Sequence, residues 1–184
     1  MNQLSEFSKR ILLDVNTPSV GTVKVVKSLE TSPFDFESLK RTENFINSYS
    51  YERCHEMTYW ILDEIPNLKA AAFHGTHSNR PAHSAILLPS GMLFDAQGIR
   101  SVETVFNEYN KITLNSRNET IKPARYLSRE ELFDVMIDVT KSFHTRADVE
   151  ASFSKRKEHN LFEKINLLLG YSASYLAQKG NLVL

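Results

Sequence analysis

The chain of 184 residues is 41% hydrophobic and 24% charged, a composition typical of a folded globular protein. This length favours one compact domain over the larger barrel and two-domain enzyme architectures. The 22 basic and 22 acidic residues give a formal net charge of zero, which argues against a protein that mainly binds nucleic acid or an anionic membrane.

The first 48 residues are predicted to contain two helices and one edge strand. Apolar side chains recur at helical spacing over residues 3–15 and again over residues 35–48. Between these segments, residues 21–29 alternate valine with lysine, which indicates a strand at the edge of a sheet.

A further helix is expected to begin at Ser50 and to run to about Ile65. Serine is a favoured N-cap residue, and Pro66 cannot continue a helix. Cys54 and Met57 belong to one apolar stripe of this helix. The sequence therefore places the cysteine in the first turn, on the buried side.

The middle of the chain has the pattern of short strands. The predicted strands are residues 68–73, 82–88, 92–96 and 121–126. Pro89-Ser90-Gly91 has the residues that a tight hairpin turn needs. The polar residues 74–81 are predicted to form a loop.

Helices are expected again after the strands. Residues 101–111 have an apolar helical pattern, whereas the polar residues 113–119 are expected to be irregular. Ser128-Arg129-Glu130-Glu131 has the sequence of a capping box and predicts the start of another helix. Residues 147–178 are helical in composition, with a break expected at Gly170.

These elements predict an α+β fold, with a small antiparallel sheet flanked by helices. We expect one domain over residues 1–184, with a core at about 44–126 and a helical C-terminal part at about 128–180. An apolar stripe in the C-terminal part is typical of core packing, although a protein partner could also use it. No glycine-rich phosphate loop or nucleotide fingerprint is present, so we predict no cofactor.

The single cysteine favours a reducing compartment, because no intramolecular disulfide can form. No apolar stretch reaches the roughly 18 residues that span a bilayer, and the first residues lack the basic region of a signal peptide. We therefore expect a cytoplasmic protein that does not contact membranes.

Cys54, His83 and Asp95 form the pattern most indicative of chemistry. Unpaired backbone N–H groups and the helix dipole stabilise a thiolate at the start of a helix. If the hairpin is centred on Pro89, His83 and Asp95 lie directly opposite each other on neighbouring strands. The carboxylate would then orient the imidazole, and the imidazole would accept the thiol proton.

An oxyanion formed during such a reaction needs hydrogen-bond donors. The backbone N–H of Cys54 is one candidate donor. Asn44, Asn47 and Gln97 are candidate side-chain donors, and the sequence does not choose among them.

Three segments around these residues carry a family resemblance. They are Arg53-Cys54-His55-Glu56-Met57, then Ala82-His83-Ser84-Ala85-Ile86-Leu87-Leu88, and then Leu93-Phe94-Asp95-Ala96-Gln97-Gly98. Their order resembles the transglutaminase-like branch of the papain-like cysteine enzymes, and small phage and bacterial proteins have a similar pattern. The resemblance covers about residues 44–98. It implies hydrolysis or acyl transfer on an amide or thioester, with a protein or peptide as substrate.

Three other interpretations remain open at this point. Cys54 could be a small buried hydrophobe, and the chain could be an inert protein-binding accessory module on the same scaffold. His74, His77 and His83 with Cys54 could instead bind zinc. His55 is expected to point away from Cys54, toward solvent or the domain interior, because adjacent residues on a helix point about 100° apart.

Overall fold

The computed structural model describes residues 4–13, 45–50, 53–140, 145–157 and 161–178. It has an α+β fold with a five-stranded antiparallel sheet in the order β4-β3-β2-β1-β5. The strands are β1 (Lys69–His74), β2 (Pro81–Leu87), β3 (Leu93–Asp95), β4 (Gly98–Arg100) and β5 (Arg125–Leu127). The predicted fold class, an antiparallel sheet with helices before and after it, is confirmed.

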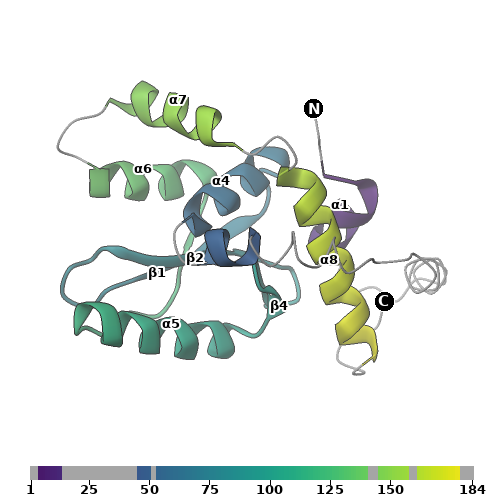
Figure 1. Cartoon of the computed structure of the whole chain (residues 1–184), viewed down its shortest axis with the longest axis horizontal. Coiled ribbons are helices and arrows are strands. Elements are labelled where there is room, and N and C mark those ends of the chain that lie inside the picture. The colour runs from purple at the N-terminus through teal and green to yellow at the C-terminus, as the bar shows by residue number, and fades with distance from the viewer. Residues whose placement is uncertain (1–3, 14–44, 51–52, 141–144, 158–160, 179–184) are drawn as a thin grey trace.

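The helices lie around this sheet. They are α1 (Glu6–Leu13), α4 (Cys54–Glu64), α5 (Val102–Arg117), α6 (Arg129–Thr140), α7 (Arg146–Arg156) and α8 (Leu161–Gln178), and residues 45–50 are also helical. Figure 1 shows α5 along one face of the sheet and α4 and α6 over the other. In the same view α7 lies beyond α6, while α1 and α8 lie together at one side.

Two hydrophobic cores follow from the alternation of side chains along the strands. Ala72 and Ile86 belong to the core beneath α4 and α6. Ala71, Phe73 and Ala85 belong to the core beneath α5. Both faces of the central strands are therefore covered, which explains why β1 and β2 are almost continuously buried.

The helix that carries Cys54 begins later than predicted. Arg53, not Ser50, is the N-cap of α4, and its side chain makes no capping hydrogen bond. Ser50 is instead the last described residue of the helical segment 45–50. Cys54 is thus the first residue of α4, which is closer to the helix end than predicted.

Other element boundaries also differ from those predicted. Helix α5 continues to Arg117, because Asn118 adopts a left-handed conformation (φ 54°) and caps it there. Helix α8 passes through Gly170 without a break. Strand β4 was not predicted, and the strand predicted at 21–29 and most of the helix predicted at 35–48 lie outside the described residues.

None of the described helices is long and apolar enough to cross a membrane. The predicted capping box before α6 is present, with Ser128 and Glu131 exchanging hydrogen bonds with each other's backbone N–H groups.

Candidate functional site

The cysteine lies at the N-terminus of α4, in a position suited to a thiolate. Cys54 is the first helical residue and is only 3% exposed. The first N–H groups of a helix have no partner within it, and they form the positive end of the helix dipole. The backbone around the sulfur therefore favours a negative charge there.

His83 and Asp95 form a buried pair on the central strands. The Nε2 atom of His83 lies 2.9 Å from Oδ2 of Asp95, and the two side chains are 0% and 1% exposed. The predicted contact is therefore confirmed. Asp95 also accepts a hydrogen bond at Oδ1 from the backbone N–H of Gln97, at 2.9 Å.

The predicted register of this hairpin was wrong by two residues. Leu87 pairs with Leu93 and Ile86 with Phe94, so that the hairpin is centred on Ser90 and not on Pro89. Asp95 consequently lies diagonally from His83 and not directly opposite. Diagonal neighbours share one face of the sheet, and long side chains can bridge them.

Helix α5 packs against the imidazole. The ring of Tyr109 stacks on the ring of His83, with centroids 3.6 Å apart and planes within 10° of each other. The Tyr109 hydroxyl donates a hydrogen bond to the backbone oxygen of Ser50, at 2.8 Å. Tyr109 therefore contacts both the imidazole and the segment that leads into α4.

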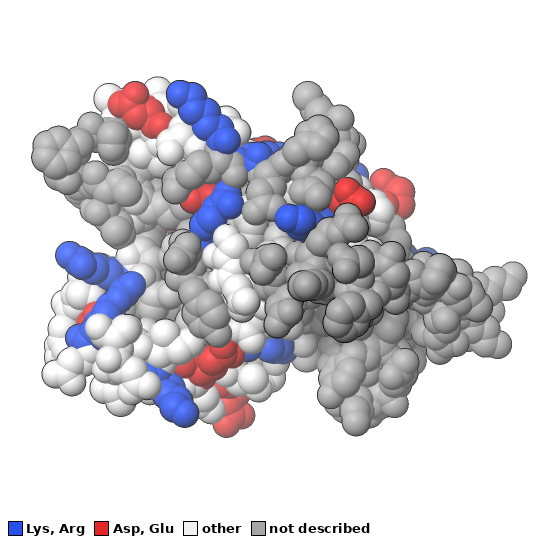
Figure 2. Space-filling view, in the orientation of Figure 1, with Lys and Arg blue, Asp and Glu red and all other residues white. Residues whose placement is uncertain are grey.

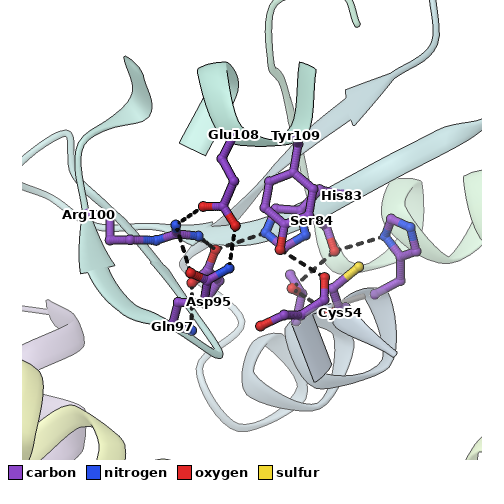
Figure 3. Close-up of polar contacts among 11 residues, drawn as sticks. Cys54, His83, Ser84, Asp95, Gln97, Arg100, Glu108 and Tyr109 are labelled. Carbon is purple, nitrogen blue, oxygen red and sulfur yellow. Dashed lines mark hydrogen bonds and ion pairs between the residues drawn. The ribbon is translucent and has the colours of Figure 1, made fainter. Parts of the chain in front are cut away.

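Helices α4 and α5 cover opposite faces of the sheet, yet the Cys54 thiol at the start of α4 reaches the His83 ring, against which α5 packs. The contact between Tyr109 and Ser50 explains how. Strands β2 and β3 pair only at Ile86 and Leu87 and at their partners, so β3 does not continue beside His83. The chain passes α5 at Ser50 and begins α4 at Cys54. Figure 3 shows Asp95, the His83 ring and the Cys54 thiol in that order across the view.

The thiol and the imidazole perturb each other. Burial raises the pKa of the Cys54 thiol, but the positive charges of His55 and His83 and their polar contacts with the sulfur hold that pKa well below its usual range. Burial lowers the pKa of His83, yet the Cys54 charge and the Asp95 hydrogen bond outweigh burial and raise that pKa to about 9. Together these shifts favour a thiolate–imidazolium pair near neutral pH.

Each ring nitrogen of His83 has a separate environment. Nε2 is held by Asp95, whereas Nδ1 is buried and makes no well-formed hydrogen bond with any described residue. Nδ1 is therefore the nitrogen left for the Cys54 proton.

His55 does not point away from the site as expected. Its Nδ1 atom is hydrogen-bonded to the hydroxyl of Ser84 at 2.9 Å, and Ser84 in turn donates to Thr58 at 3.1 Å. Thr58 donates to the backbone oxygen of Cys54 at 2.9 Å. The hydrogen bond with Ser84 on β2 therefore orients the His55 side chain toward the sheet. A second imidazole consequently lies near the Cys54 sulfur.

The candidate oxyanion donors do not converge on the thiol. Asn44 lies outside the described residues, and Asn47 is exposed on the helical segment 45–50. The Gln97 side chain donates to Glu108 at 2.7 Å and accepts from Arg100 at 3.2 Å, so both ends of its amide are engaged. The backbone N–H of Cys54 remains the candidate donor at the start of α4.

The alternative zinc ligands are not brought together. Within the described ranges, which include all four of these residues, no group of three His, Cys, Asp or Glu side chains is arranged to hold a metal ion. His74 is buried, and its desolvation and the charge of Arg125 lower its pKa to about 4. The backbone N–H of His77 instead donates to Glu119 at 3.0 Å.

Arg100, Glu108 and Tyr109 were not predicted as site residues from the sequence. Arg100 lies on the unpredicted strand β4, with Nη2 2.5 Å from Oδ2 of Asp95. Glu108 and Tyr109 look like ordinary members of an amphipathic helix. Only the three-dimensional position of α5 shows that they contact the other site residues.

Comparison of the chain with protein-family models, with curated proteins and with solved structures finds no match. The functional interpretation therefore depends on the residues and geometry of the site itself.

Proposed function

We propose that this protein is a cysteine-dependent hydrolase or acyltransferase acting on an amide or thioester, with Cys54 as nucleophile, His83 as proton carrier and Asp95 as orienting carboxylate. The observation that carries the proposal is the contact of 2.9 Å between His83 Nε2 and Asp95 Oδ2. This contact leaves Nδ1 for a thiol at a helix N-terminus. Such an order of nucleophile, base and orienting group is the general requirement for covalent acyl chemistry.

The proposed reaction has two stages. The Cys54 thiolate attacks the carbonyl carbon, and the resulting oxyanion is stabilised by the N–H group of Cys54 at the start of α4. The imidazolium of His83 gives its Nδ1 proton to the leaving amine or thiolate, and a thioester forms on the enzyme. Neutral His83 then takes a proton from water or from an acceptor amine, which attacks the thioester and releases Cys54.

The element order supports the family that the sequence resembles. The cysteine begins helix α4, the histidine lies on β2, the second strand after that helix, and the aspartate lies on β3, the next strand along the chain. We therefore propose that the chain belongs to the transglutaminase-like branch of the papain-like cysteine enzymes, as a cytoplasmic protein of phage or bacterial type. Its substrate would be a protein or peptide.

Burial of all three side chains favours a second candidate function. Cys54, His83 and Asp95 are each no more than 3% exposed, so the thiol is covered in this structure. A buried pair of this kind would also suit an inert protein-binding module that retains the scaffold and binds a partner through its C-terminal helices. Accessibility of the thiol separates the two functions.

Alkylation of the native protein tests the proposal. We expect iodoacetamide to modify Cys54 with an apparent pKa below that of a free thiol, about 8.5. Since Cys54 is the only cysteine, a Cys54→Ala variant gives the background directly. His83→Asn should raise the apparent pKa toward that of a free thiol. Modification that needs prior denaturation would refute the enzymatic function and favour the inert module.

A further inference from the structure

Arg100 and the side chains around it are not used by the proposed reaction. The Arg100 side chain is only 15% exposed, and its Nη2 atom binds Oδ2 of Asp95, the same oxygen that accepts from His83. We infer that Arg100 is a positioning residue that fixes the orientation and the charge of Asp95, and through Asp95 those of His83. This inference rests on the proposed function, because it concerns the same pair of side chains.

The guanidinium is itself held in place by a closed ring of contacts (Figure 3). Arg100 binds Glu108 of α5, and its Nη1 atom donates to the side-chain oxygen of Gln97 at 3.2 Å. The Gln97 amide donates to Glu108 at 2.7 Å, and the Gln97 backbone N–H donates to Asp95 at 2.9 Å. Asp95 ends β3, Gln97 lies in the turn that follows, and Arg100 ends β4, so all three belong to one short hairpin. Little freedom is therefore left to the carboxylate that orients the imidazole.

The charges alternate along this line of side chains. A Cys54 thiolate is followed by the His83 imidazolium, the Asp95 carboxylate, the Arg100 guanidinium and the Glu108 carboxylate. Removing the Arg100 charge makes the group more negative, which disfavours the thiolate and raises the pKa of Cys54. Removing the Glu108 charge makes the group less negative and lowers that pKa. Two neutralising substitutions are thus expected to act in opposite directions.

The experiment measures thiolate formation as a function of pH. Thiolate absorbs in the ultraviolet, and because the chain has one cysteine, a Cys54→Ser variant supplies the baseline. We expect Arg100→Gln to move the midpoint to higher pH by about half a unit, a roughly threefold change in thiolate fraction on the rising limb. Glu108→Gln should move it to lower pH by a similar amount. Arg100→Lys keeps the charge and should stay closer to the wild type than Arg100→Gln.

A matched control separates electrostatics from packing. Arg129 is also part-buried and ion-paired, with Asp63 and Glu130, so Arg129→Gln removes a comparable arginine outside the ring of contacts. It should leave the midpoint unchanged. Circular dichroism shows which variants fold. If Arg100→Gln does not fold, the titration midpoint of Glu108→Gln alone tests the inference.

Two results would overturn the role of Arg100. One is a midpoint in the folded Arg100→Gln variant that is equal to or below that of the wild type, and the other is a Glu108→Gln midpoint that is equal to or above that of the wild type. Neither depends on the wild-type value. A wild-type midpoint at the pKa of a free thiol would instead contradict the proposed function. Failure of the inference about Arg100 and failure of the proposed function are therefore distinguishable.

Discussion

Replacing Asp95 by asparagine is expected to destabilise the folded protein strongly, because the asparagine amide cannot satisfy its neighbours. The carboxylate accepts from His83 and Arg100 at Oδ2 and from the Gln97 N–H at Oδ1. An asparagine has one acceptor oxygen. In one orientation its NH₂ group faces the Gln97 N–H, and in the other it faces Arg100, even if His83 changes to the tautomer in which Nε2 is unprotonated. That tautomer carries its proton on Nδ1 and cannot accept one from the thiol.

The magnitude follows from the burial of the pair. Removing one partner of a buried ion pair costs about 3–5 kcal/mol, and a buried donor without an acceptor costs about 1–3 kcal/mol. Asparagine keeps the shape and one acceptor, and Arg100 keeps its contact with Glu108. We therefore expect a loss of about 3 kcal/mol in the free energy of unfolding, against a typical total of about 5–15 kcal/mol.

Urea unfolding at neutral pH measures this loss. Asp134→Asn is the matched control, because Asp134 is 65% exposed and pairs with Arg146 at the surface. It should change the free energy of unfolding by less than about 0.5 kcal/mol. If Asp95→Asn unfolds at the same urea concentration as Asp134→Asn, the buried pair does not contribute as argued.

The loss should also depend on pH with a definite sign. Burial raises the pKa of Asp95, but the hydrogen bond and charge of His83 and the charge of Arg100 outweigh it and hold that pKa below its usual value. A carboxylate with a depressed pKa stabilises the folded state above its unfolded pKa of about 4, and this stabilisation is lost as the pH falls through the folded pKa. The difference in the free energy of unfolding between the wild type and Asp95→Asn should therefore become smaller at acidic pH.

Two further substitutions test one contact away from the triad and one beside it. Gly75→Ala should lower the urea midpoint, because a Cβ there would overlap the Glu119 carboxylate. In a Glu119→Ala background, Gly75→Ala should lower the midpoint by less. Equal losses in both backgrounds would refute this explanation. Tyr109→Phe keeps the ring stack but loses the hydrogen bond to the Ser50 backbone oxygen, so the free energy of unfolding should fall by about 1 kcal/mol. A Tyr109→Phe variant as stable as the wild type in urea would show that this bond contributes nothing.

The central strands were predictable because their signals are local. Strands β1, β2 and β3 begin and end within one residue of the predicted bounds, since alternation, proline and glycine mark the strands and the turn between them. The end of α5 was missed for a different reason. Its last turns do not continue the apolar stripe, because Leu114 is exposed and the residue buried between Ile112 and Leu114 is the polar Thr113.

The side chains that support the triad could not be predicted in the same way. Tyr109 contacts His83, 26 residues earlier in the chain, only because α5 lies across that face of the sheet. Arg100 reaches Asp95 because Gly98, with φ of 102°, lets the chain reverse directly into β4. Both contacts depend on tertiary placement, which the periodicity of one segment does not encode.

The contact between His83 and Asp95 was predicted from an incorrect register, and the reason lies in the period of a strand. The hairpin loop has three residues, closed by the hydrogen bond from the Gly91 N–H to the Leu88 oxygen, with Gly91 at φ 81°. This loop shifts the pairing by two residues from the predicted one. Side chains alternate with a period of two, so an even shift keeps Asp95 on the same face as His83, whereas a shift of one would have placed it beneath α4. The face of the sheet, and not direct opposition across it, therefore determines that these two side chains meet.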